Sequence, residues 1–160
     1  MFARLSELLT AYSSEEPILL ERRAAWRLRL RWRETFVPDV LTASGKRPTT
    51  RPWESLLDPR AHALWDLDAR EAYREAAMSS SRAYLFFDVG HGGRVDEVSF
   101  LAHLTGKIPH DVARAFVEDG PEHVDMYVVE EQLSWTMVWP HERDRIPIFA
   151  FAAPTGDALS

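Results

Sequence analysis

The sequence predicts an α+β domain: a small, mostly antiparallel sheet of about four strands, with N-terminal and connecting helices packed on it. Helical apolar spacing dominates residues 1–80, and apolar runs typical of strands dominate residues 81–153. No regular alternation of strand and helix and no internal repeat interrupts this order. At 160 residues, the chain has the length of one domain with a sizeable core. We therefore expect a single domain over residues 1–160.

Three helices are expected in the first half. Leucines at helical spacing predict a short helix over residues 2–12, and a similar rhythm predicts another over residues 61–78. Between them, Ser13 and Glu16 have capping-box spacing, which predicts the start of a long helix over residues 15–37.

The long helix is expected to have two apolar faces, one with Trp26 and Leu30 and the other with Trp32, which is typical of a helix packed between layers. Six arginines lie within residues 22–33, and three of them form a stripe between these faces: Arg22, Arg29 and Arg33. One interpretation is an anion or RNA surface with interleaved tryptophans. The favoured interpretation is a core helix whose arginine stems cover apolar surface while their heads find carboxylates.

The strongest strand signal lies in residues 124–142, which we expect to form a β-hairpin. Apolar and aromatic residues alternate over residues 124–129 and again over 134–139, and residues 130–133 suit a turn. Both faces of the hairpin are partly apolar, which predicts helices packed over it. Pro140 ends the second strand because it has no N–H to donate.

The remaining apolar runs predict two more strands and two short helices. Residues 83–89 read as a central strand, and residues 146–153 as a last strand at an edge, because of Pro147. Residues 95–104 fit helical spacing, and residues 109–116 predict a second short helix.

A glycine cluster, Gly90-His91-Gly92-Gly93, follows the first of these strands. One interpretation is a phosphate-binding turn at a helix start, which would make the chain a nucleotide-binding module. The cluster matches neither common phosphate-loop pattern, and a plain turn explains it equally well.

Part of the second half matches a pattern known from elsewhere. An aromatic strand (residues 84–87) is followed by D-x-Y-V-V (residues 125–129) and W-T-x-V-x-x-H-E (residues 135–142). With these motifs the C-terminal half resembles an uncharacterised bacterial family called domain of unknown function 4275. That family often ends with a Gly-Pro-aromatic stretch, which this chain lacks. The family has no established activity, so the resemblance implies a fold and no chemistry.

The hairpin also carries the candidate functional residues. His141 and Glu142 form a polar pair at the exit of a strand, and they are the candidate acid and base of a small hydrolase or transferase. The favoured interpretation is that the pair caps the strand or contacts a partner. The residues expected to contact a partner are Tyr127, Glu130, Glu131, Trp135, Trp139, His141 and Glu142.

Composition excludes several kinds of site. The chain has no cysteine, so it has no thiol nucleophile, disulfide or cysteine-ligated metal. Five of its histidines are conceivable metal ligands, but none of their spacings fits a common motif: His91, His103, His110, His123 and His141. We expect no metal and no cofactor. No run approaches the roughly 18 apolar residues that span a bilayer, and the N-terminus lacks a signal peptide, so we expect a cytoplasmic protein without membrane contact.

Charge is divided unevenly along the chain. Residues 1–60 carry 11 basic and 8 acidic side chains, whereas residues 61–160 carry 8 basic and 17 acidic ones. An acidic surface disfavours nucleic acid as a ligand and suits a basic protein partner. The sequence therefore favours a non-catalytic protein-binding module, of the immunity or antitoxin type, that neutralises a partner with a basic surface.

Overall fold

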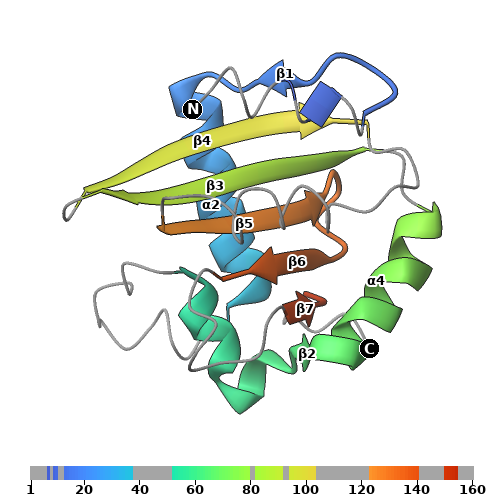
Figure 1. Cartoon of the computed structure of the whole chain (residues 1–160). Coiled ribbons are helices and arrows are strands. Elements are labelled where there is room, and N and C mark those ends of the chain that lie inside the picture. Colours follow the sequence, from blue (N-terminus) through green and yellow to red (C-terminus); the bar gives the residue numbers. More distant parts are fainter. Residues whose placement is uncertain are drawn as a thin grey trace.

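The computed structural model describes Glu7, Leu9, Thr10 and residues 13–37, 52–79, 82–91, 94–103, 123–140 and 150–154 (Figure 1). Within this part of the chain, seven strands form one antiparallel sheet. Their order is β1-β4-β3-β5-β6-β7-β2. The strands are β1 Ile18–Leu19, β2 Leu64–Trp65, β3 Ala83–His91, β4 Arg94–Ala102, β5 His123–Glu130, β6 Thr136–Trp139 and β7 Ala150–Ala152.

The α+β class is broadly right, but the prediction of about four strands is wrong. The predicted strands correspond to β3, β5, β6 and the short β7, and the sheet has β1, β2 and β4 in addition. Two of these have two residues each, too few to show a period of two. The third, β4, occupies residues that we predicted as a helix. Its full-length pairing with β3, from Ala83↔Ala102 to His91↔Arg94, overrides the helical spacing of its apolar residues.

The predicted hairpin is confirmed. Strands β5 and β6 pair antiparallel from Met126↔Trp139 to Val129↔Thr136, and β6 ends just before Pro140. Leu133 in the connecting turn has a φ of 58°, and its N–H donates to the carbonyl of Glu130 at 2.8 Å. The chain thus reverses within the segment that the sequence marks as a poor strand former.

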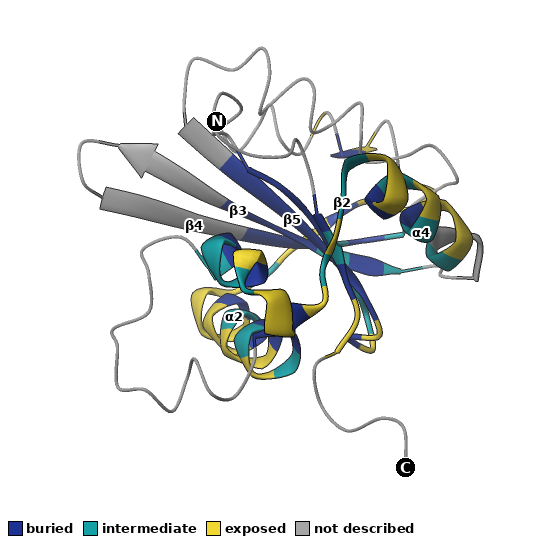
Figure 2. Cartoon of the chain, turned by 90° about the horizontal axis from the view of Figure 1, so that it is seen from below, coloured by how far each residue is buried: buried dark blue, intermediate teal, exposed yellow. Residues whose placement is uncertain are grey.

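Two α-helices cover opposite sides of this sheet: α2 Arg22–Phe36 and α4 Asp66–Ser79 (Figure 2). Successive residues of a strand point to opposite faces, so Leu85 and Phe87 join the core under α4 while Phe86 joins the core under α2. Two 3-10 helices, η1 Pro52–Leu57 and η2 Pro59–Ala61, lie in the chain between α2 and β2. Trp53 and Leu56 of η1 complete the core on the α2 side.

Both α-helices begin later than predicted. The residues before α2 form β1 instead, and Ser13 does not cap a helix: its hydroxyl donates to the carbonyl of His103 at 3.1 Å. The residues before α4 form β2, and Asp66, with a φ of 52°, turns the chain into the helix. At both helix starts, residues whose apolar spacing also suits a helix form a short strand instead, because they pair with a neighbouring strand of the sheet.

Some predictions fall outside the described residues. They include the helix over residues 109–116, most of the helix over residues 2–12, and the start of the last strand at Pro147. The described part of that strand, β7, lies between β6 and β2, so the predicted edge position is wrong: the two-residue β2 forms the edge.

Candidate functional site

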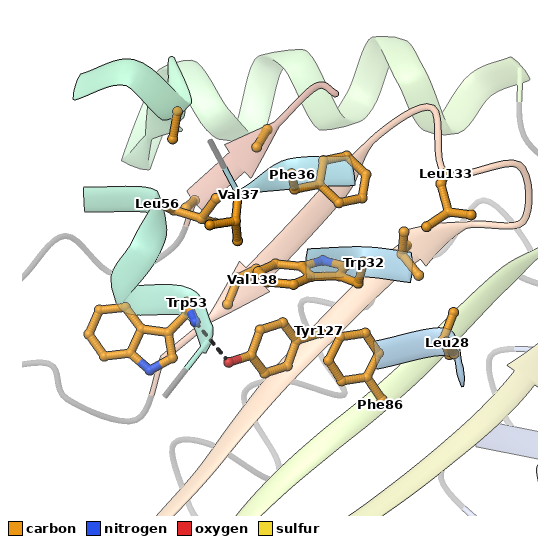
Figure 3. Packing of buried hydrophobic residues seen from close by; sticks show 14 residues of the cluster. Leu28, Trp32, Phe36, Val37, Trp53, Leu56, Phe86, Tyr127, Leu133 and Val138 are labelled. Carbon is orange, nitrogen blue, oxygen red and sulfur yellow. Dashed lines mark hydrogen bonds between the residues drawn. The ribbon is translucent and has the colours of Figure 1, made fainter. Parts of the chain in front are cut away.

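Tyr127 lies in the core on the α2 side of the sheet (Figure 3). Its ring stacks on that of Phe86, with 4.4 Å between centroids, and meets the ring of Trp32 edge-on at 5.3 Å. Its hydroxyl accepts a hydrogen bond of 3.1 Å from the backbone N–H of Trp53. Tyr127 therefore fixes η1 to the sheet, and its ring is inaccessible to a partner.

Trp135 and Trp139 lie in the core on the opposite, α4 side. The ring of Tyr73, from α4, meets both of them edge-on, at centroid distances of 5.4 Å and 6.3 Å. Trp135 also stacks on Phe151 of β7 at 6.0 Å. The three aromatic residues predicted to contact a partner are thus core residues, because the sheet is covered on both sides.

Glu130 and Glu131 hold the turn of the hairpin. A carboxylate oxygen of Glu130 accepts hydrogen bonds from the N–H of Gln132 and the hydroxyl of Ser134, both at 2.8 Å. Glu131 lies 3.4 Å from the guanidinium of Arg82, just before β3. These contacts give both carboxylates a structural role, although neither side chain is buried.

Asp125 is the one buried carboxylate in the described part of the chain. Its Oδ2 accepts a hydrogen bond of 3.1 Å from the indole Nε1 of Trp53. This hydrogen bond is a structural contact. Asp125 and Tyr127, two residues apart on β5, thus both bind Trp53 of η1.

His141 and Glu142, the candidate acid and base, lie outside the described residues. The same holds for His110 and for the side chains of His91 and His123. The described His103 has its Nδ1 3.6 Å from Glu15, and this contact connects the end of β4 to the segment before β1. No group of three or more histidine, aspartate or glutamate residues suited to a metal ion occurs in the portion of the chain that can be described.

The described half of the glycine cluster lies in a strand. Gly90 and His91 are the last residues of β3, and His91 pairs with Arg94 of β4. A phosphate-binding turn needs a helix start after the glycines, and here a strand follows them. The nucleotide interpretation therefore loses its structural basis.

The arginine stripe is divided between core and surface. Arg29 donates a hydrogen bond of 2.9 Å to the carbonyl of Phe87, and its guanidinium carbon lies 4.8 Å from the centre of the Phe86 ring. Arg33 is half-buried, and Arg22 is exposed. The favoured interpretation of a core helix thus fits Arg29, which bonds a backbone carbonyl of the sheet.

Two of the exposed surfaces in the described part of the chain combine large apolar residues with charged residues on an α-helix. On the outer side of α2, which we call the arginine face, Trp26 is 56% exposed and Leu30 36% exposed. Beside them on this face are three exposed arginines: Arg23, Arg27 and Arg31.

The second surface, which we call the acidic face, lies on β2 and the outer side of α4. Leu64 is 42% exposed and Leu67 is 73% exposed. The carboxylates of Asp68, Glu71 and Glu75 are exposed around them. Large apolar residues surrounded by charges are typical of surfaces that bind other molecules.

The sequence contains signals for both surfaces that we did not interpret as such. Leu67 lies two residues before the buried Ala69, which on a helix places it on the opposite side. Trp26 likewise lies two residues before the buried Leu28. We expected the face with Trp26 to pack in a second layer, whereas the described structure covers α2 on one side.

Comparisons with family models, curated proteins and solved structures find no match to this chain. The resemblance to domain of unknown function 4275 therefore stays a prediction, and the geometry has to carry the functional argument. Among the helices described, none is both long and apolar enough to cross a membrane.

Proposed function

We propose that this chain is a non-catalytic protein-binding module of the immunity or antitoxin type, and that its acidic face neutralises a partner with a basic surface. The observation that carries this proposal is the exposure of Leu67, at 73%, among carboxylates. An exposed leucine supplies apolar area that a partner can bury, and the carboxylates select a partner of opposite charge.

The charges around Leu67 fit this role. Three glutamate and aspartate side chains are exposed on α4, against one exposed arginine, Arg74. The nearby Asp58 does not add to the acidic face, because Arg60 binds it at 2.6 Å. The hydrogen bond from the Arg60 side chain lowers the pKa of Asp58 to about 2. The exposed carboxylates of α4 thus supply the negative charge of this surface.

The proposal also agrees with the charge of the sequence. Residues 61–160 hold 17 acidic and 8 basic side chains, and α4 lies in this part. A partner with a basic surface would be attracted before contact, which raises its association rate at low salt.

The test is a pull-down from cells of the source organism with the tagged chain and its Leu67→Arg and Glu71→Arg variants. We expect the unmodified chain to recover a basic protein and both variants to recover at least tenfold less of it, because an arginine places like charge against the partner. Salt should weaken the recovery, since the contacts are surface charges.

The matched control is Glu16→Arg, which makes the same charge change at an exposed residue outside the acidic face. It should recover as much partner as the unmodified chain. Equal recovery by Glu71→Arg, Leu67→Arg and Glu16→Arg would show that the acidic face does not bind the partner, and a recovered partner with an acidic surface would contradict the charge argument.

A further inference from the structure

The arginine face has the features of a binding surface in its own right. Trp26 and Leu30 are one helical turn apart, so their side chains form a continuous exposed apolar ridge on α2. Tryptophan buries a large area when it is covered, and it is enriched among the residues that contribute most to protein interfaces. The described structure places no other element over this ridge.

The arginines beside the ridge are available for ion pairs with another molecule. Arg23, Arg27 and Arg31 are spaced by four residues, which aligns them along one side of Trp26 and Leu30. All three are exposed, and none of their side chains has a hydrogen bond or ion pair within the described part of the chain. Arginine is also enriched at the centres of interfaces, because its planar group binds carboxylates with two hydrogen bonds.

The acidic face of the same chain offers the matching chemistry. Leu67 supplies an exposed apolar side chain that can pack on the Trp26–Leu30 ridge. Glu71 and Glu75 supply carboxylates one turn apart on α4. Each surface thus presents an exposed apolar centre beside a row of charges, and the two rows have opposite signs.

We propose that the chain binds a second copy of itself, with the arginine face of one copy on the acidic face of the next. This inference rests on the proposed function in one respect, since it takes the acidic face to be a binding surface. It adds that the chain carries, on its own α2, a basic and apolar surface of the kind that the acidic face would bind.

The position of the two faces determines the form of the assembly. Because α2 and α4 cover opposite sides of the sheet, a copy that uses one face still has the other face available (Figure 2). Such a head-to-tail contact does not close into a symmetric dimer. It forms a ring if the rotation between copies closes, and an open chain of copies if it does not.

Two other occupants of the arginine face are less well matched. Nucleic acid would pair with the arginines, but the chain has a net charge of -6, which repels a polyanion. Anionic lipid would accept Trp26 and Leu30 at its interface, and the same net charge opposes its approach. The acidic face, in contrast, matches both the charge and the apolar centre of the arginine face.

The test measures the mass of the purified chain in solution against protein concentration, by light scattering after size-exclusion chromatography. We expect masses of two or more copies at low salt, and at least a tenfold weaker association at high salt, where surface charges are screened. Arg27→Glu and Glu71→Arg should each weaken association at least tenfold, because each sets like charges against one another. A chain with both substitutions has the charges at positions 27 and 71 exchanged, so its association should be restored.

Mixing the two single variants gives the sharpest result. The Arg27→Glu chain keeps its acidic face and the Glu71→Arg chain keeps its arginine face, so the unmodified contact can form between them. Their substituted faces carry opposite charges at the exchanged positions, as in the double variant, and can also meet. We expect the mixture to associate at a concentration at which each variant alone has the mass of a single copy. Circular dichroism and the melting temperature of each variant confirm that it is folded.

Several results would overturn the inference. They are a single-copy mass at every concentration, association that both variants leave unchanged, and binding of the single-copy chain to vesicles of anionic phospholipid or to single-stranded RNA that Arg27→Glu abolishes. The proposed function fails separately. If Glu71→Arg blocks self-association but leaves the recovery of a partner from the source cells unchanged, the self-association is supported and the proposed function is contradicted. If the unmodified chain has the mass of a single copy and Glu71→Arg abolishes the recovery of that partner, the proposed function is supported and the self-association is contradicted.

Discussion

The layers on the two sides of the sheet differ in how they are held and in what they present to solvent. On the α2 side, polar groups fix aromatic rings: Trp32 donates to Thr136 at 2.8 Å, and Trp53 donates to Asp125 at 3.1 Å. On the α4 side, the ring of Tyr73 packs edge-on against two tryptophans. The outer surface of α2 is basic and that of α4 is acidic.

The difference shows that the two layers on one sheet can differ in how strictly they fix the positions of their aromatic rings. A buried hydrogen bond to an indole N–H has a strict geometry, and leaving one partner unpaired costs more than the bond contributes. Ring contacts accept small shifts of the ring. We therefore expect substitutions on the α2 side to cost more stability than similar ones on the α4 side.

The largest effect is expected for Trp32→Ala. Trp32 is 1% exposed, contacts the rings of Phe36, Phe86 and Tyr127, and donates a hydrogen bond to Thr136. Its truncation leaves a cavity and removes this donor, while the Thr136 hydroxyl keeps its own hydrogen bond to the carbonyl of Val128. We expect a loss of about 3–5 kcal/mol in the free energy of unfolding, measured by urea denaturation. The milder Trp32→Phe keeps an aromatic ring and should cost clearly less. A loss below about 1 kcal/mol for Trp32→Ala would contradict the packing on this side.

The next largest effect is expected for Asp125→Ala, which leaves the indole N–H of Trp53 unpaired in the core. The cost should be about 1–3 kcal/mol. Removing the donor with Trp53→Phe, alone and together with Asp125→Ala, gives a double-mutant cycle. Because the two side chains bond directly, we expect a coupling energy of at least about 0.5 kcal/mol. Additive losses would show that the bond does not contribute.

On the α4 side, we expect the stability of the fold to depend on alkaline pH through Tyr73. Burial raises the pKa of the Tyr73 phenol above its ordinary range. In the unfolded chain this group ionises near pH 10, so folding excludes the charged form. Its stabilising effect is complete below about pH 10 and is lost as the pH rises toward the raised pKa. Denaturation midpoints measured across this range should fall less steeply for Tyr73→Phe than for the unmodified chain, and parallel curves would show that Tyr73 ionises freely.

The sequence predicts the centre of this fold better than its edges. Residues 83–89 and the hairpin over residues 124–142 carry enough alternating or continuous apolar residues to reveal β3, β5 and β6. The edge strands β1 and β2 contain two residues each, and only their partners, β4 and β7, define them. Local spacing cannot show such pairing, since it depends on a distant segment.

The burial of three aromatic candidates could not be predicted for a related reason. Tyr127, Trp135 and Trp139 lie on a strand pattern that is equally compatible with an exposed recognition patch and with a core. The choice depends on whether both sides of the sheet are covered, and this follows from the positions of α2 and α4. The sequence did indicate the second apolar face of the long helix, with Trp26 and Leu30, but not that it is exposed.

The smallest effect on stability is expected where the proposed binding surfaces lie. Trp26→Ala removes a large side chain from α2, as Trp32→Ala does, but Trp26 is 56% exposed and Trp32 is 1% exposed. Alanine also has the better helix propensity, so the free energy of unfolding should change by no more than about 0.5 kcal/mol. The same holds for Leu67→Ala on α4. If these two residues serve interfaces, both variants should retain the melting temperature and weaken association, and a large loss of stability for Trp26→Ala would mean that its ring belongs to the fold and not to a partner.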